Sequence, residues 1–261
     1  MKPWHFIGIL LPLLGCSHGS PAENQKTLKS ELEPIVIQEI PEPIQEMAVP
    51  KPNQNLDLQQ KRDKQILMNV PMIEQNPELK YGCEVTSLAM VLKYAGAETD
   101  KMRLFNEIKK DSDSLKRTAN GDIISWGNPA EGFVGDMTGK RAGYAVFDKP
   151  MVDLINKYLP GRAVNLTGQE FEAVLEHVAE GNPAVVWTTG DYRIPDRWES
   201  WTHGKEVIKT PLDLHAVVLV GFNDTSVYLN DPLSGRKQVQ VNKNRFIETW
   251  KAMQSRAVSY R

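Results

Sequence analysis

The feature that most constrains this chain is a cysteine that directly follows a glycine and opens an apolar segment with helical spacing. Cys83 follows Gly82, and apolar side chains then recur at one-turn intervals over residues 85–92. This spacing predicts a helix that begins at Cys83 and ends near Gly96, a residue suited to a left-handed C-terminal cap. A thiol in the first helical turn lies where free N–H groups and the helix dipole favour negative charge. Because the thiolate is the reactive form, the pattern predicts that Cys83 is a nucleophile.

A base for this nucleophile is expected in the C-terminal part of the chain. His215 lies at the start of the strongest strand pattern, residues 214–222, and a second strand pattern, 227–230, leads directly into Asp231. If the two strands pair about the intervening turn, facing residue numbers sum to roughly 449, which places Asp231 about three residues along the strand from His215. Asn230 is a competing partner for the histidine, and Asp231 also suits a plain turn. The pattern therefore predicts His215 as the base and leaves its orienting residue open.

The remaining polar candidates are less specific. Gln75 lies in a loop before Cys83, where its side-chain amide can donate to a developing oxyanion or simply bond to nearby backbone. His177 lies on a predicted helix and suits a structural role, whereas His203, in a segment expected to be irregular, suits a substrate contact. A cysteine first and a histidine with an aspartate later is the layout of a papain-like cysteine hydrolase.

The N-terminal end reads as an export signal. A basic start precedes a short apolar run, residues 6–14, which ends in a Leu-Leu-Gly-Cys sequence that resembles a bacterial lipobox. We therefore expect a lipoprotein signal peptide over residues 1–15 and a lipid-modified Cys16, with an ordinary secretory peptide as the alternative. The proline- and glutamate-rich segment 16–64 is expected to be a disordered tether. If Cys16 carries a lipid, Cys83 has no disulfide partner, because the chain has only two cysteines.

Residues 65–261 are expected to form one α+β domain, with helices first and an antiparallel sheet after them. The glycine-rich segment 119–147 is expected to be a long loop that either walls a substrate cleft or packs its aromatic side chains on the core. Residues 190–213 are expected to be irregular as well. Aromatic side chains from these two segments are the candidates for a substrate cleft, namely Trp126, Trp198 and Trp201.

Composition excludes several classes of function. The chain has 31 Lys and Arg against 33 Asp and Glu, with no basic run, so nucleic acid is not expected as a partner. No metal site and no cofactor are expected, because the histidines and cysteines show no ligand spacing and no phosphate loop or dinucleotide fingerprint is present.

The sequences around Gln75, Cys83, His215 and Asp231 resemble the stand-alone, exported branch of the bacteriocin-leader (double-glycine) peptidase-like family, from about residue 66 to the C-terminus. The resemblance implies a papain-like fold in which these four residues are the oxyanion donor, nucleophile, base and orienting residue. Members linked to transporters carry Asp-Cys-Gly at the nucleophile, whereas this chain has Gly-Cys-Glu.

The residues and the resemblance together favour a membrane-anchored, extracytoplasmic thiol hydrolase that acts as a monomer on peptide or amide bonds. The alternative from another class is a non-catalytic lipoprotein that binds peptides or cell-wall fragments, and acyl transfer in place of hydrolysis is a third option. Either enzymatic reading gives the chain a peptide or protein substrate.

Overall fold

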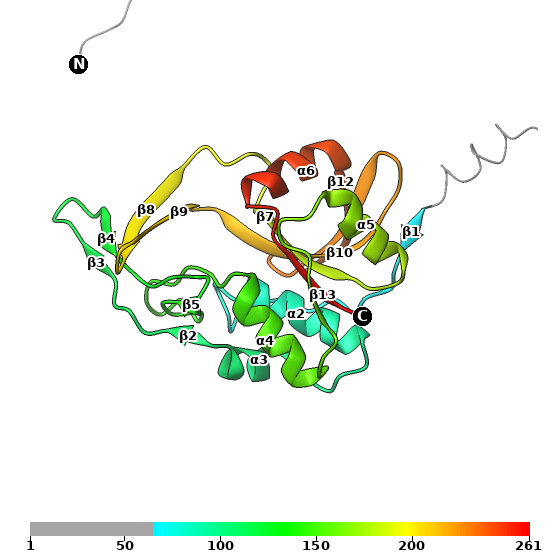
Figure 1. Cartoon of the computed structure of the whole chain (residues 1–261), viewed down its shortest axis with the longest axis horizontal. Coiled ribbons are helices and arrows are strands. Elements are labelled where there is room, and N and C mark those ends of the chain that lie inside the picture. The colour runs from blue at the N-terminus through cyan, green and yellow to red at the C-terminus, as the bar shows by residue number, and fades with distance from the viewer. Residues whose placement is uncertain (1–64) are drawn as a thin grey trace, which may run out of the picture. The chain divides into compact units, whose positions relative to one another are not determined.

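A computed structural model describes residues 65–261 of the chain (Figure 1). The signal peptide, the lipidated Cys16 and the tether expected over residues 1–64 lie outside the described residues. The fold is α+β and papain-like, as the sequence predicted.

A seven-stranded sheet forms the centre of the described part. Its main path runs in the order β12-β11-β10-β7-β13-β6, and β1 pairs with β10 outside this path. Every pairing in this sheet is antiparallel. The strands are β1 (Ile66–Leu67), β6 (Ala163–Asn165), β7 (Ala184–Thr189), β10 (Leu214–Phe222), β11 (Ser226–Asp231), β12 (Arg236–Asn242) and β13 (Ala257–Tyr260).

Helices cover both faces of this sheet. Figure 1 shows α2 and α4 on one side of the strands and α5 and α6 on the other. The helices are α2 (Cys83–Tyr94), α3 (Lys101–Glu107), α4 (Asp148–Tyr158), α5 (Phe171–Ala179) and α6 (Lys243–Ala252). Strands β7 and β10 are buried along nearly their whole length, as expected for central strands with a layer on each face. Among residues 65–261, no helix combines the length and the apolarity needed to cross a bilayer.

Residues 190–213 are not irregular, and that expectation was wrong. They contain two strands, β8 (Trp198–His203) and β9 (Glu206–Pro211), which form an antiparallel hairpin. This hairpin joins β3 (Lys116–Arg117) and β4 (Ile123–Ser125) in a second sheet of order β3-β4-β8-β9, which extends to one end of the domain in Figure 1. Most of its side chains are exposed or half-buried, so the alternation of apolar and polar residues that marks a strand in sequence is missing.

The glycine-rich segment 119–147 contains β4 and also β5 (Phe133–Val134), which pairs in parallel with β2 (Lys110–Asp111). Its aromatic side chains are largely packed inward. Trp126 and Tyr144 pack with Trp201 of β8 in a small apolar cluster, separate from the main core. This cluster attaches the second sheet to the segment.

Candidate active site

Cys83 is the first residue of α2, as predicted, and is a free cysteine. Only 6% of the residue is exposed. The preceding Gly82 is required by packing, because a Cβ atom there would lie 2.5 Å from Cβ of Leu79. The glycine therefore lets the chain turn tightly into the helix, and the turn places the thiol at the helix N-terminus, where amide N–H groups have no partner within the helix.

His215, near the start of β10, pairs with Asp231 at the end of β11. Nε2 of the imidazole lies 2.8 Å from Oδ1 of the carboxylate, and both residues are buried. The strand register is within one residue of the expected one, since Val218 faces Asn230. Asn230 is engaged elsewhere: its amide donates to the Val70 carbonyl and its oxygen accepts from the amide of Gln238. Asp231, and not Asn230, is thus the partner of the histidine.

The turn after β11 holds the Asp231 carboxylate in place. The hydroxyl of Ser234 donates to Oδ2 at 2.6 Å, and the amide of Leu233 donates to Oδ1 at 3.0 Å. Burial acts to raise the pKa of Asp231, but the His215 ring and these two donors outweigh it and hold the pKa well below its usual range. The carboxylate is therefore an ionised partner that favours a proton on Nε2 of His215 and leaves Nδ1 to face a reacting group.

The helix that begins at Cys83 packs on β10, the strand that carries His215. Ser87, one turn after Cys83, donates its hydroxyl hydrogen to the carbonyl of Ala216, the residue after His215, at 3.2 Å. Burial raises the pKa of the Cys83 thiol, and the backbone of Ala216 offsets part of that rise, so the thiol lies close to the residue that follows His215. The structure therefore pairs the predicted imidazole with the predicted carboxylate and packs the helix of the thiol against the same strand.

A carboxylic acid next to the thiol is the main feature that sequence reasoning missed. Oε2 of Glu84 lies 3.3 Å from the sulfur of Cys83, and the Glu84 side chain is fully buried. Burial, and then the charge of Glu84, raise the pKa of Cys83 well above its usual value. Burial also raises the pKa of Glu84 itself, from 4.5 to about 7. The only signal in the sequence was the glutamate of the Gly-Cys-Glu motif.

Gln75 is buried in the turn that precedes α2, on the segment expected to supply an oxyanion donor. Its side-chain nitrogen donates to the carbonyl of Lys80 at 2.8 Å and to that of Leu79 at 3.3 Å. Its side-chain oxygen is buried without a partner. In this arrangement Gln75 shapes the turn that leads to Cys83, and its role as an oxyanion donor stays a prediction.

The segment 135–147 lies against the residues that lead into the nucleophile. The amide of Tyr81 donates to the carbonyl of Met137, and the amide of Val146 donates to Oε1 of Glu84. The indole N–H of Trp187 in turn donates to the Val146 carbonyl at 3.2 Å. The loop therefore forms one wall of the site around Cys83 and Glu84, and its role as the wall of a substrate cleft stays a prediction.

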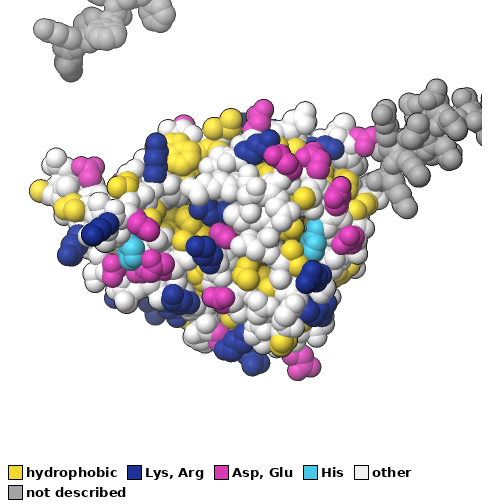
Figure 2. Space-filling model, viewed as in Figure 1, with side chains coloured by type: hydrophobic (Ala, Val, Ile, Leu, Met, Phe, Trp, Pro, Cys, Tyr) yellow, Lys and Arg dark blue, Asp and Glu magenta, His cyan; other side chains and the backbone are white. Residues whose placement is uncertain are grey.

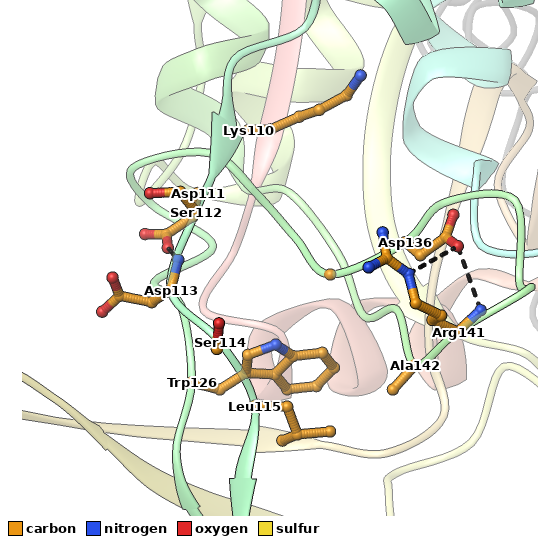
Figure 3. Close-up of a pocket in the computed structure, with 11 residues that line it drawn as sticks. Lys110, Asp111, Ser112, Asp113, Ser114, Leu115, Trp126, Asp136, Arg141 and Ala142 are labelled. Carbon is orange, nitrogen blue, oxygen red and sulfur yellow. Dashed lines mark hydrogen bonds and ion pairs between the residues drawn. The ribbon is translucent and has the colours of Figure 1, made fainter.

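The three candidate tryptophans have different surroundings. Trp126 lines an open pocket of about 480 Å³ between residues 110–115 and the turn 135–142, where Asp136 and Arg141 form an ion pair (Figure 3). Trp201 is buried, and its indole N–H donates to the Gly127 carbonyl. Trp198 is 42% exposed. Cys83 does not line this pocket, which is bordered by the loop residues and not by the thiol.

The best candidate ligands for a metal ion within residues 65–261 are Asp111, Glu131 and His203, whose ligand atoms lie within 4.8 Å of one another. Figure 2 shows acidic side chains around a histidine at the end of the domain that carries β8 and β9. Burial opposes protonation of His203, but the Trp126 carbonyl and the nearby carboxylates raise its pKa. The imidazole of His203 lies 3.3 Å from Asp113 and 3.4 Å from Glu131, so its protonated form would pair with these carboxylates, and the substrate contact expected for His203 stays a prediction.

Comparison with known proteins identifies the family. The model of the peptidase C39-like family matches residues 67–258. The chain belongs to this family. It is 36% identical over 182 residues to the uncharacterized protein YvpB of Bacillus subtilis strain 168, which covers 70% of each chain. A crystal structure of a protein assigned as a C39-like peptidase from Bacillus anthracis has a TM-score of 0.70 and 41% identity, covering 76% of this chain and 98% of the other.

Membership of this family supports a cysteine-peptidase type of function. Residues 67–258 include Gln75, Cys83, His215 and Asp231, so all four predicted site residues fall within the matched part. They also include supporting residues that the sequence did not single out. Ser234 holds the carboxylate of Asp231, and Arg245 of α6 donates to the carbonyl of Tyr192, a buried residue close to Asp231 with a φ of 59°.

Proposed function

We propose that this chain is a thiol hydrolase that cleaves peptide or amide bonds through an acyl-enzyme on Cys83. The observation that carries the proposal is the buried pair of His215 and Asp231, 2.8 Å apart, on strands against which the helix that begins with the free thiol of Cys83 packs. A histidine with only a structural role would not need a buried carboxylate that a serine hydroxyl and a backbone amide also hold in place.

The reaction proceeds in two halves. Nδ1 of His215 takes the proton of the Cys83 thiol, and the thiolate attacks the carbonyl carbon of the scissile amide to form a C–S bond. The tetrahedral intermediate collapses, the C–N bond breaks, and the imidazolium gives its proton to the leaving amine. Water, deprotonated by His215, then attacks the thioester; the C–S bond breaks and the proton returns to the thiolate.

The oxyanion of the intermediate needs donors near the helix N-terminus. The backbone N–H of Cys83 is one candidate, because the first amides of a helix have no intrahelical partner. Gln75 is the second, and this role requires its nitrogen to exchange one of its two carbonyl partners for the substrate. The turn 75–82 is the part of the site that would adjust when substrate binds.

The proposed location is outside the cytoplasm, with the chain anchored to the membrane through a lipid on Cys16. This part rests on the lipobox-like sequence that ends at Cys16. Metabolic labelling with a fatty acid, comparing the natural chain with Cys16→Ala, tests it. Label that persists in Cys16→Ala would overturn this assignment.

A non-catalytic peptide-binding protein is the second candidate, and one observation favours it: the thiol is nearly inaccessible and burial opposes its ionisation. Peptide-resolved mass spectrometry of Cys83 labelling by iodoacetamide separates the two. For a hydrolase, Cys83 of the folded chain reacts at least about tenfold faster than in His215→Ala, because the imidazole stabilises the thiolate. His177→Ala, the same change on α5, is the matched control and should react like the natural chain.

Equal rates for the natural chain and His215→Ala would favour the binding protein. Hydrolysis of a complex peptide mixture by the natural chain, but not by Cys83→Ala, gives a second and independent measurement. New peptide ends that appear equally with both proteins would exclude Cys83 as the nucleophile.

A further inference from the structure

Glu84 is a buried carboxyl group that the reaction as described above does not use. It directly follows the nucleophile, and its two oxygens have separate partners. Oε1 accepts a hydrogen bond from the amide of Val146 at 3.1 Å, and Oε2 accepts one from the thiol of Cys83 at 3.3 Å. No ion pair to Glu84 exists within residues 65–261. A fully buried carboxylate without a cation is unfavourable, so the protonated form is favoured here.

The groups that face Glu84 from neighbouring elements do not supply a counter-charge. Tyr144, in the loop, directs its hydroxyl to Thr210 and to the Pro211 carbonyl. Arg256, which lies close enough to influence Tyr144, pairs with Asp148 at 3.6 Å. On β10, His215 is bonded to Asp231. The Glu84 carboxyl group therefore has no positively charged partner among these groups.

The backbone fixes the orientation of the carboxyl group. Val146 donates to Oε1 through its amide, and its carbonyl accepts from the indole of Trp187, so this peptide unit is held on both sides. Because Oε1 is held by the Val146 amide, a proton on neutral Glu84 lies on Oε2, and the hydrogen bond to the sulfur reverses when the thiol gives up its own proton: Oε2–H then donates to the thiolate. The geometry therefore provides a hydrogen-bond donor to a thiolate in the protonated state and a negative charge beside it in the ionised state.

We propose that protonated Glu84 donates a hydrogen bond to the Cys83 sulfur and thereby holds it as the thiolate, and that loss of this proton turns the nucleophile off. The inference rests on the proposed function in taking Cys83 as the reacting group. The proton of the thiol moves to Nδ1 of His215, while the proton of Glu84 stays on Oε2 throughout. Glu84 is thus a positioning residue that restricts thiolate formation to neutral and mildly acidic conditions, in keeping with its pKa of about 7.

Glutamine is a close mimic of protonated glutamate at this position. Its oxygen can accept from Val146 while its nitrogen donates to the sulfur, and it cannot ionise. Glu84→Gln should therefore keep the donor at every pH. Glu84→Ala removes the donor and also leaves the amide of Val146 unpaired. Glu172→Gln is the matched control, because Glu172 is likewise in the first turn of a helix, α5, but is exposed and distant from the thiol.

The experiment measures the rate of alkylation of Cys83 by iodoacetamide in the full chain from about pH 5 to about pH 9, resolved from Cys16 by mass spectrometry. At about pH 8, Glu84→Gln should react at least about tenfold faster than the natural chain, because a neighbouring negative charge shifts a pKa by one unit or more. At about pH 6 the two should react alike, and Glu84→Ala should be slower than both. Glu172→Gln should follow the natural chain throughout.

Coincident profiles for Glu84→Gln and the natural chain, with near-UV circular dichroism showing both folded, would overturn the proposal. So would a Glu84→Ala variant that is folded and as reactive as Glu84→Gln. Alkylation needs no substrate, so the effect of Glu84 on Cys83 can be measured even if the chain hydrolyses no peptide, a result that would contradict the proposed function. Conversely, if the alkylation rate depends on His215 but its pH profile is the same with and without Glu84, only the present inference is contradicted.

Discussion

Nε2 of His215 lies 2.8 Å from Oδ1 of Asp231, and both groups are buried where α2 meets the central sheet. The contact fixes which ring nitrogen is available to the substrate side. It also places a negative charge behind the ring, which would stabilise the imidazolium of the proposed reaction.

Removing this carboxylate should therefore impair the chemical step more than the fold. We expect Asp231→Ala to lower kcat by about 100-fold or more, within the range known for general acid–base groups. Asp231→Asn should lose less, because its side-chain oxygen can still accept from Nε2. Ser234→Ala, which removes a single donor from Oδ2, is the matched control and should have the smallest effect. Steady-state kinetics on one peptide substrate checks the order, and an order in which Ser234→Ala is the most damaging would contradict it.

Gln75 should contribute to stability whether or not it contacts the oxyanion. Its nitrogen satisfies the carbonyls of Leu79 and Lys80 in a buried turn. We expect Gln75→Ala to reduce the free energy of unfolding by about 1–3 kcal/mol, the usual cost of leaving a buried acceptor unpaired. Urea unfolding followed by fluorescence measures the change. If Gln75→Ala unfolds like the natural chain but its kcat is about 100-fold lower, Gln75 has a purely catalytic role.

The elevated pKa of Glu84 predicts a pH-dependent penalty on stability. The folded chain holds this proton up to about pH 7, whereas the unfolded chain releases it near 4.5. The penalty is therefore absent below about pH 4.5, grows as the pH rises, and is complete above about pH 7, where it is on the order of 3 kcal/mol. The free energy of unfolding of Glu84→Gln, relative to that of the natural chain, should therefore increase as the pH rises from about 4.5 to about 7.

Urea unfolding of both proteins at several pH values tests this, because all groups other than Glu84 and the thiol of Cys83 beside it titrate alike and cancel in the difference. A difference that stays constant from acid to alkaline conditions would show that Glu84 does not titrate as described.

The glycine at 143 should be indispensable to the loop wall. A Cβ atom there would lie 2.2 Å from the carbonyl oxygen of Asp136 and 2.7 Å from the ring of Tyr81, just before the nucleophile. We expect Gly143→Ala to displace the loop from the site and lower both kcat/KM and Tm. Gly190→Ala is the matched control, since a Cβ atom there meets nothing within 4 Å. Thermal unfolding and kinetics of the two variants check this, and equal behaviour would contradict it.

The sequence predicted the parts of the site that lie on strongly patterned elements. The helix that begins at Cys83 and the strand that carries His215 are buried along almost their whole length, so their apolar patterns are clear. The short turn between β10 and β11 limits the possible registers, and the estimate of the facing residues was correct to within one position. The choice of Asp231 over Asn230 needed the structure, because neighbouring strand residues point to opposite faces.

The second sheet and the role of Glu84 could not be predicted, because the residues that form them show no clear apolar pattern in the sequence. Strands β8 and β9 have few buried positions, so their sequence resembles that of a loop. The role of Glu84 depends on the amide of Val146, which lies far away in the sequence and belongs to a segment without regular periodicity. Contacts of this kind arise from the path of a loop, which local propensity does not determine.

The division of the site between a helix and a sheet means that the site is assembled only when the two pack together. The thiol comes from α2, whereas its base and carboxylate come from β10 and β11, and the two halves meet only through the packing of the helix on the strands. Before that docking, Cys83 is an ordinary cysteine without a neighbouring base. The reactivity that we propose for Cys83 therefore depends on this docking, and a chain that still lacks β10 and β11 would not have it.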